Sequence, residues 1–556
     1  MPGDDLPYVI QWLCNRLEKL CLLSDSDLLP VFEQSLLEIS ASFDCDECLL
    51  LLQGCLSNSS NVEYFIRILK AVSVCATKID FKHFGRFKGV FISCESLLKN
   101  LPYSELLCAL NASADLFGNL ISPAKSKLLN STDKSFLQHH TLFMISMLPY
   151  NDSQDTEIVL TRFISNLSNI GVGLYTLYLS CRKLLLTSPD MVLYGRTAAS
   201  VIVPSWIRLL HYFFTSSTHE LYRFWPLVFT DDYWIDLICL LVDFLLDRSK
   251  RNLLLDNCKV SLVDSKNQAF NSDRYSKLRR FTLHFIQSLF KKYSCSLHRV
   301  WWNPDRFKLL ECLEIVATEP VSDASLPEYI TEAVGCIEQI ISSSTYLARF
   351  CIYAKLLEPI QDNIHHGWRG HVVTLFKNNL HNLIMQTVKD FEGYSEVTDP
   401  ENSVNTCYSE EVRRIFKYIF RYPLPFNSQE NLIDESSWLL SALNLALYIF
   451  MTFKSNPSSP VIYIVELLTN NTDGKLSYFC EFMYNLKSCL DQRIVQCQAG
   501  ISALQVTLSN TDDTTKISTL TSKLGVQESI MLRLRLLEMT LHQTEKYLPF
   551  KLTSSV

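Results

Sequence analysis

The chain has 556 residues, too many for one compact core, and 48% of them are hydrophobic, so disorder of the whole chain is excluded. Its net charge of −7 gives no basic footprint for a nucleic-acid partner. Glycine and proline number only 15 and 19, which favours helices over sheet-rich or loop-rich folds.

Apolar residues in the first half recur three or four positions apart, as they do on amphipathic helices. Gly171 and Gly173 predict a bend or a division of the segment 158–185, and Pro204 predicts a kink or a division in the segment 191–214. No stretch alternates convincingly between apolar and polar residues, so strands are not expected. The expected helices cover residues 6–23, 25–40, 43–56, 62–75, 84–98, 104–121, 136–148, 158–185, 191–214 and 219–247.

The second half has the same periodicity after a weakly patterned segment, 248–274, which is interpreted as an exposed insertion. A linker with two prolines at 318–328 indicates a boundary. It separates an N-terminal helical-repeat region, 1–320, from a C-terminal HEAT-like region, 321–556, that ends in a long capping helix pair. The expected helices are 275–293, 307–317, 329–344, 347–364, 371–391, 410–420, 434–450, 461–468, 476–509 and 527–548.

The most informative stretch is 371–450, where three helices follow one another. The second ends before Pro423, and Asp434 is a good N-cap for the third. The third helix is apolar almost all round from Trp438 to Phe450, so it is expected to be buried. Helices that need neighbours on two sides predict an all-α fold, a HEAT/armadillo-like α-solenoid of stacked helix pairs.

The sequence contains no pattern that would support catalysis, a cofactor or a metal. Cys45 and Cys48 form one CxxC pair, but a zinc site needs four ligands, so two half-buried thiols are the favoured interpretation and a metalloprotein the alternative. The neighbours His139 and His140 would point about 100° apart on a helix and are interpreted as surface or helix-end residues. We therefore expect no enzyme, no cofactor and no bound metal.

The sequence also suggests a compartment. The first residues are acidic where a signal peptide would be basic. The most apolar window, 234–246, is shorter than the roughly 20 residues that cross a bilayer. Many of the 19 cysteines lie at apolar helical positions, where a free thiol acts as a small hydrophobic group. We expect a reduced, cytoplasmic protein without membrane insertion.

One short segment resembles a binding hot spot. Trp368 and Arg369 lie in a glycine-flanked turn expected just before the helix at 371–391. Tryptophan and arginine are the residues most enriched at interface hot spots. A buried tryptophan that only fastens the turn to its neighbours is the favoured alternative.

Two segments carry a resemblance to a known family: VVTLFKNNLHNLI at 372–384 and ENLIDESSWLLSALNLALYIF at 430–450. With a weaker likeness at 194–210 and 526–548, they resemble the C-terminal half of the glomulin family, HEAT-like inhibitors of cullin–RING ubiquitin ligases. The resemblance implies that the C-terminal region binds the RING domain of the RING-box subunit. It would cover the face that recruits the ubiquitin-conjugating enzyme, and an immunophilin is a further partner of the family.

Five residues between 365 and 556 are candidate contacts because we expect their side chains to be exposed; the family resemblance does not assign them. They are Trp368, Arg369, Lys377, Asn378 and His381. The alternative function is a helical-repeat scaffold or transport adaptor with an unrelated partner, because one fold serves many functions.

Overall fold

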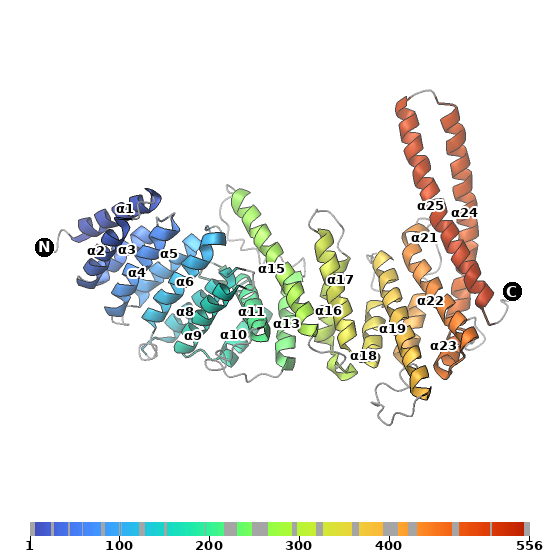
Figure 1. Cartoon of the computed structure of the whole chain (residues 1–556), viewed down its shortest axis with the longest axis horizontal. Coiled ribbons are helices and arrows are strands. Elements are labelled where there is room, and N and C mark those ends of the chain that lie inside the picture. Colours follow the sequence, from blue (N-terminus) through green and yellow to red (C-terminus); the bar gives the residue numbers. More distant parts are fainter. Residues whose placement is uncertain are drawn as a thin grey trace. The chain divides into compact units, whose positions relative to one another are not determined.

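A computed structural model shows a chain of α-helices that divides into two compact units, Met1–Phe285 and Ile286–Val556 (Figure 1). The residues that the structure describes are 6–23, 27–42, 45–57, 59, 61–78, 84–98, 101, 103–121, 128–149, 153–194, 196–215, 231–246, 265–291, 297–318, 326–358, 366–392, 410–420, 431–469, 477–511 and 514–549.

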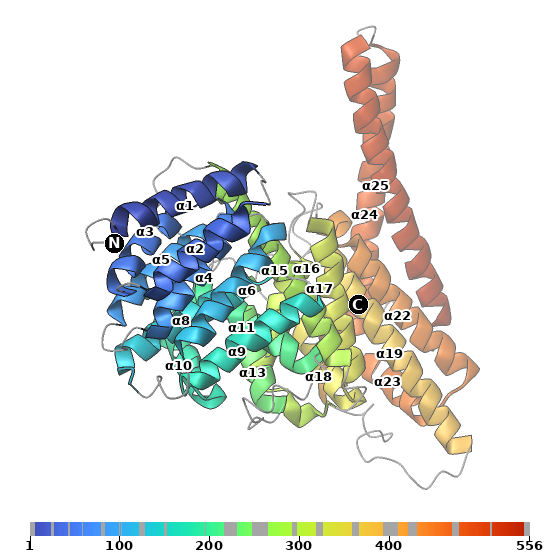
Figure 2. The same cartoon turned by 60° about the vertical axis from the view of Figure 1, so that its left-hand side comes forward.

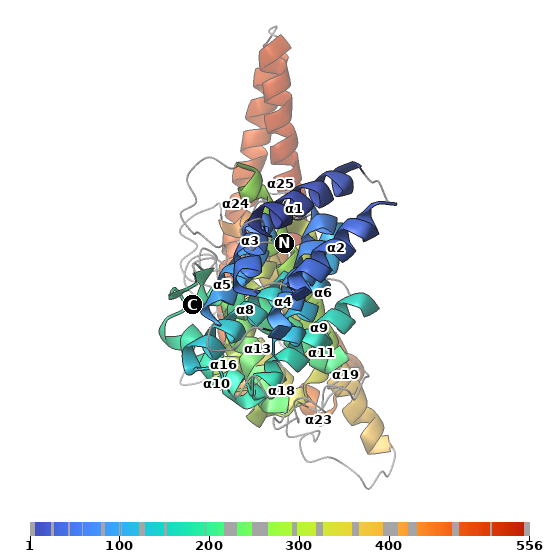
Figure 3. The same ribbon diagram turned by 90° about the vertical axis from the view of Figure 1, so that its left-hand side faces the viewer.

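Helices of the first unit pack in two layers, because most of them contact a helix that is not their immediate neighbour in the chain (Figures 2 and 3). One layer holds α1, α3, α5, α8 and α11, and the other holds α2, α4, α6 and α9. The bounds are α1 Leu6–Leu23, α2 Leu29–Ser42, α3 Cys45–Ser57, α4 Val62–Lys78, α5 Gly85–Leu98, α6 Tyr103–Leu120, α8 Ser131–Met147, α9 Gln154–Asn169, α10 Leu174–Thr187, α11 Ala198–Thr215, α13 Asp231–Leu246 and α15 Ser265–Lys291. Helix α15 crosses the boundary between the units.

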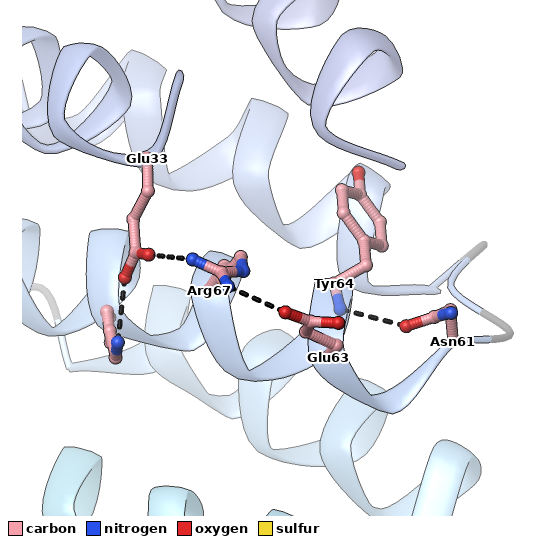
Figure 4. A network of polar contacts seen from close by, with 6 residues as sticks. Glu33, Asn61, Glu63, Tyr64 and Arg67 are labelled. Carbon is pink, nitrogen blue, oxygen red and sulfur yellow. Dashed lines mark hydrogen bonds and ion pairs between the residues drawn. The ribbon is translucent and has the colours of Figure 1, made fainter. Parts of the chain in front are cut away.

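Polar residues fix how α4 begins and how it packs in its layer (Figure 4). The Asn61 side chain accepts a hydrogen bond from the Tyr64 backbone N–H at 3.1 Å, as an N-cap does. One turn further on, the Arg67 guanidinium forms ion pairs with Glu63 on its own helix and with Glu33 on α2. The cap and the ion pairs set the start of α4 and its position beside α2.

The first unit agrees with one sequence-based expectation and departs from another. The segment 158–185 is divided into α9 and α10 at Gly171, as the two glycines predicted, and the φ of +79° at Gly171 is a conformation that side chains rarely adopt. Two short antiparallel strands, β1 Val192–Leu193 and β2 Arg196–Thr197, precede α11, although no strand was expected. Pro204 lies inside α11, which continues from Ala198 to Thr215, so the segment is not divided at the proline.

The second unit contains the C-terminal helices, which again pack side by side. Helix α16 contacts α17, α18 contacts α20, α19 contacts α22, and α25 contacts both α22 and α24. The paired helices α24 and α25 extend well beyond the other helices of this unit (Figures 1 and 2). The bounds are η4 Arg299–Trp301, α16 Pro304–Ala317, α17 Leu326–Ser343, α18 Tyr346–Leu356, α19 His366–Glu392, α20 Glu410–Phe420, α21 Asn431–Asp434, α22 Ser436–Ser455, α23 Ser459–Thr469, α24 Tyr478–Ser509 and α25 Thr514–Tyr547.

Several expected boundaries in the second unit are shifted. The compact units divide inside α15 and not at 320, because α16 and α17, on either side of that point, pack together. Helix α19 begins at His366, so Trp368 and Arg369 are helical and not in a turn. Asp434 ends α21, and Glu435 takes the N-cap position of α22 without a side-chain cap bond. Helix α25 begins at Thr514, thirteen residues before the expected start at 527.

Helix α22 forms the core of the second unit, as the sequence predicted. Trp438, Leu439, Ala442, Leu443 and Phe450 are all buried, and the helix contacts α19, α23 and α25. By length and composition α22 could cross a membrane, and half of its apolar window is buried inside the unit. The core helix of a soluble protein passes the same test, so this feature is weak evidence for a span.

Candidate protein-binding surface

Trp368 fastens the first turn of α19 to α16. Its indole is 6% exposed, and its Nε1 donates a hydrogen bond to Oε1 of Glu314 at 2.8 Å. The ring also stacks on His371 with centroids 5.7 Å apart. Trp368 is therefore a buried residue that joins two helices, as the favoured alternative predicted. Little of its surface is accessible to a partner.

Electrostatics around Trp368 depend on two partly buried charges. Burial raises the pKa of Glu314 to about 7, although the Trp368 hydrogen bond and the charge of Arg369 both act to lower it. Burial also lowers the pKa of Arg369, and the carboxylates of Glu435 and Glu314 oppose that shift. Arg369 therefore lies near two acidic groups, at the junction of α16, α19 and α22, and their charges offset only part of the cost of burying it.

Helices α19 and α22 approach each other closely at Gly370. A Cβ atom on Gly370 would lie 2.9 Å from the backbone oxygen of Ser437, closer than real contacts allow. Glycine is needed here because only a residue without a side chain admits this separation. The two segments that carry the family resemblance, 372–384 and 430–450, thereby become neighbours in the structure.

The outer edge of this helix pair carries the remaining sequence-based candidates. Asn378 and His381 are exposed on α19, and Lys377 is half-buried. His381 Nδ1 lies 2.8 Å from the hydroxyl of Tyr448 on α22. The three side chains thus follow one polar edge of α19, about three turns along the helix from Trp368.

A second apolar face on α25 was missed from the sequence. The stripe of Leu534, Leu537 and Leu541 is buried, as expected. Leu532, Leu536 and Met539 also recur four and three residues apart, so they share another face of α25, yet they are 72%, 49% and 65% exposed. We call these three residues the α25 stripe. Their spacing was the available signal, but one helix with two apolar faces is normally assigned to a core.

The cysteines and histidines form no candidate metal site among the described residues. Cys48 is buried, while the side chain of Cys45 lies outside the described set. The interpretation of His139 and His140 as surface or helix-end residues was wrong, because both are buried within α8. His140 Nδ1 lies 2.6 Å from Glu95, and Arg196 pairs with the same carboxylate at 2.8 Å, which allows polar groups in the interior.

Similarity to known proteins is low in sequence and in structure. No protein-family model matches the chain, and no curated protein sequence matches it. An engineered protein of known structure is 12% identical over 95% of this chain and 99% of its own, with a TM-score of 0.22. Kap121p is 11% identical over 91% of this chain and 56% of its own, with a TM-score of 0.21. This chain thus spans about half the length of Kap121p.

The class of the protein follows from its own helices. Each unit is built from helices packed side by side, with two two-residue strands as the only sheet in the described part. The chain is an all-α, HEAT/armadillo-like helical-repeat protein, and the predicted fold class is confirmed.

Proposed function

We propose that the C-terminal unit binds the RING domain of the RING-box subunit of a cullin–RING ubiquitin ligase. Bound there, it covers the surface that recruits the ubiquitin-conjugating enzyme and so inhibits ubiquitin transfer. The resemblance of segments 372–384 and 430–450 to the glomulin family supports this role, since those segments form the adjacent helices α19 and α22. The role places the chain in the cytoplasm.

The α25 stripe is the observation that carries the proposal. Exposed apolar side chains gathered on one face are typical of protein–protein contact sites. Helix α25 packs directly on α22, so the stripe belongs to the same helical layer as the resembling segments. Arg533 and Arg535, both exposed, flank the stripe and supply the polar rim that such interfaces have.

Inhibition by steric competition requires no catalytic step. A bound helical unit prevents the ubiquitin-conjugating enzyme from reaching the same surface, so the two proteins compete. Affinity then comes from a few apolar anchors surrounded by polar contacts, and not from a catalytic group. An inhibitor of this kind raises the enzyme concentration needed for half-maximal ubiquitin transfer, because excess enzyme displaces it.

The test uses the full chain with a purified cullin–RING-box complex. Leu536→Asp should weaken binding about tenfold or more, since it places a charge at the centre of an apolar contact. Leu186→Asp is the matched control, because Leu186 on α10 of the first unit is also exposed, at 58%. Equal binding by both variants would remove the stripe from the interface.

The second measurement separates binding from masking. Discharge of ubiquitin from its conjugating enzyme should slow when the full chain is added, and excess conjugating enzyme should restore the rate. If the chain binds the complex but leaves discharge unchanged, it acts as a scaffold. If it does not bind, the proposal is rejected and the adaptor function becomes the better one.

A further inference from the structure

A second candidate site lies elsewhere in the C-terminal unit. A cavity of about 280 Å³, open to solvent, is lined by residues from the turn around η4 and from α16, α18 and α20. Trp302, Phe307 and Tyr418 supply aromatic walls, and Trp302 is 8% exposed. The cavity is smaller than the roughly 300–1,000 Å³ of sites that hold a drug-sized ligand, and its size suits one side chain.

This cavity is lined by three cations, Arg299, Lys355 and Arg414, and by two carboxylates, Glu358 and Glu411. Arg299 pairs with Glu411 at 2.7 Å, and Lys355 pairs with Glu358 at 3.2 Å. Lys355 also reaches Glu311 at 3.0 Å, outside the lining.

Arg414 on α20 is the third cation of the lining. It is exposed and forms no ion pair with any residue in the described part of the chain. One positive charge at the rim is therefore available to an incoming group, next to aromatic walls.

We propose that this cavity, the Arg414 pocket, binds an acidic peptide segment of a partner protein. An aromatic or aliphatic side chain of that segment enters between Trp302 and Tyr418, and a neighbouring aspartate or glutamate pairs with Arg414. The site is independent of the proposed masking of a RING domain, which rests on the α25 stripe.

The chemistry of the lining agrees with reversible binding and not with covalent capture. Cys351 lines the cavity, and burial together with the charge of Glu411 raises the pKa of its thiol to about 11. At neutral pH this cysteine stays protonated, and a protonated thiol is a poor nucleophile. It acts as part of the apolar wall.

Charge complementarity favours an acidic peptide over a neutral or basic one. A carboxylate at the rim can pair with Arg414, which lines the same cavity as the aromatic residues. A neutral peptide with the same ring gains only the apolar contact. The acidic residue of the peptide therefore determines which peptides bind, and the aromatic ring of the peptide determines their position in the cavity.

The experiment uses the full chain and a peptide array. Each peptide carries one phenylalanine, tyrosine, tryptophan or leucine at a set spacing from one glutamate or aspartate, and its twin carries glutamine or asparagine instead. The acidic peptides should bind and their amide twins should bind much less. Absence of any preference for the acidic member would overturn the proposal.

Two neighbouring arginines provide matched variants. Arg413 and Arg414 are both exposed on α20, but only Arg414 lines the cavity. Arg414→Ser should weaken the best acidic peptide about tenfold and reduce the salt dependence of binding, whereas Arg413→Ser should change affinity less than about twofold. Equal loss in both variants would show that general surface charge, and not this pocket, attracts the peptide.

Tyr418→Ala tests the apolar half of the site. Tyr418 is half-buried, so its removal opens the pocket wall with less effect on the core than removal of Trp302. The variant should weaken acidic peptides with a ring more than those with leucine. Unchanged affinity for all of them would mean that no side chain enters the cavity, and the proposal would fail.

Discussion

The indole of Trp368 donates a hydrogen bond to the carboxyl group of Glu314 at 2.8 Å, and this bond joins the first turn of α19 to α16. The same carboxyl group lies near Arg369, so one acidic side chain connects the two residues that the sequence singled out. Both residues therefore shape the C-terminal unit from inside, whatever partner its surface binds.

The first prediction concerns the pH dependence of this junction. Burial raises the pKa of Glu314 from 4.5 to about 7, so between these values the folded chain holds a proton that the unfolded chain releases. The free energy of unfolding of the C-terminal unit should therefore fall as pH rises through this window. Glu314→Gln should flatten the slope. Hydrogen exchange of the amides in α19, corrected for their intrinsic exchange rates, measures this slope. Identical slopes in the native chain and in Glu314→Gln would mean that Glu314 does not cause the pH dependence.

The second prediction separates the donor of Trp368 from its ring. Trp368→Phe keeps an aromatic side chain but leaves Glu314 without its hydrogen bond, which should cost about 1–3 kcal/mol of unfolding free energy near pH 8. The variant should bind the RING-box complex as the native chain does, because the indole is 6% exposed. Trp12→Phe, at an exposed position of the first unit, is the control. A large loss of binding with unchanged stability would restore Trp368 as a contact residue.

The third prediction compares two glycines on one helix. Gly370→Ala would bring a methyl group within 2.9 Å of the Ser437 backbone, so α19 and α22 must move apart, at a cost of about 1–3 kcal/mol. Gly367→Ala meets nothing within 4 Å and should stabilise the chain by about 0.5–1 kcal/mol. In urea unfolding, the changes in unfolding free energy of the two variants should have opposite signs. Equal changes would mean that α19 and α22 do not need a glycine at position 370.

How far the sequence could predict this molecule depends on the range of the forces involved. Helix α22 was identified because its apolar residues surround the helix, a property of neighbouring positions alone. The burial of His139 and His140 could not be identified in this way. It depends on Glu95 and Arg196, which lie about 45 and 55 residues away in the sequence and contact these histidines only in the folded chain. The boundary at 320 failed similarly, since two prolines suggest a linker while helix packing determines the unit.

The candidate surface was predicted less completely than the fold. His381 and Asn378 could be placed on the outer side of α19 from periodicity, because the opposite face is apolar. The exposure of Leu532, Leu536 and Met539 depends on which neighbours α25 has on each side. The spacing of apolar residues along α25 predicts two apolar faces. It does not determine which of them another helix covers.

The fourth prediction concerns the buried charges of the first unit. Burial alone would raise the pKa of Glu95, but its hydrogen bond to His140 and the charges of His140 and Arg196 lower it below its usual value. Glu95→Gln leaves Arg196 buried without that charge, and should cost about 3–5 kcal/mol of unfolding free energy. Asp115→Asn, which breaks an exposed pair with Arg162, should cost less than about 1 kcal/mol. Urea denaturation distinguishes the two, and similar small costs would show that the buried network adds nothing.

The last prediction is that the two units respond to pH in opposite directions. Burial lowers the pKa of His139 from 6.5 to about 4, so between these values the unfolded chain binds a proton that the folded chain excludes. The free energy of unfolding of the first unit should therefore fall as pH drops through this window, whereas Glu314 destabilises the second unit as pH rises. Hydrogen exchange read separately at α8 and α19 should give slopes of opposite sign. His139→Gln should reduce the slope at α8 and leave that at α19 unchanged. Slopes of the same sign in the native chain would mean that these two groups do not control the pH response.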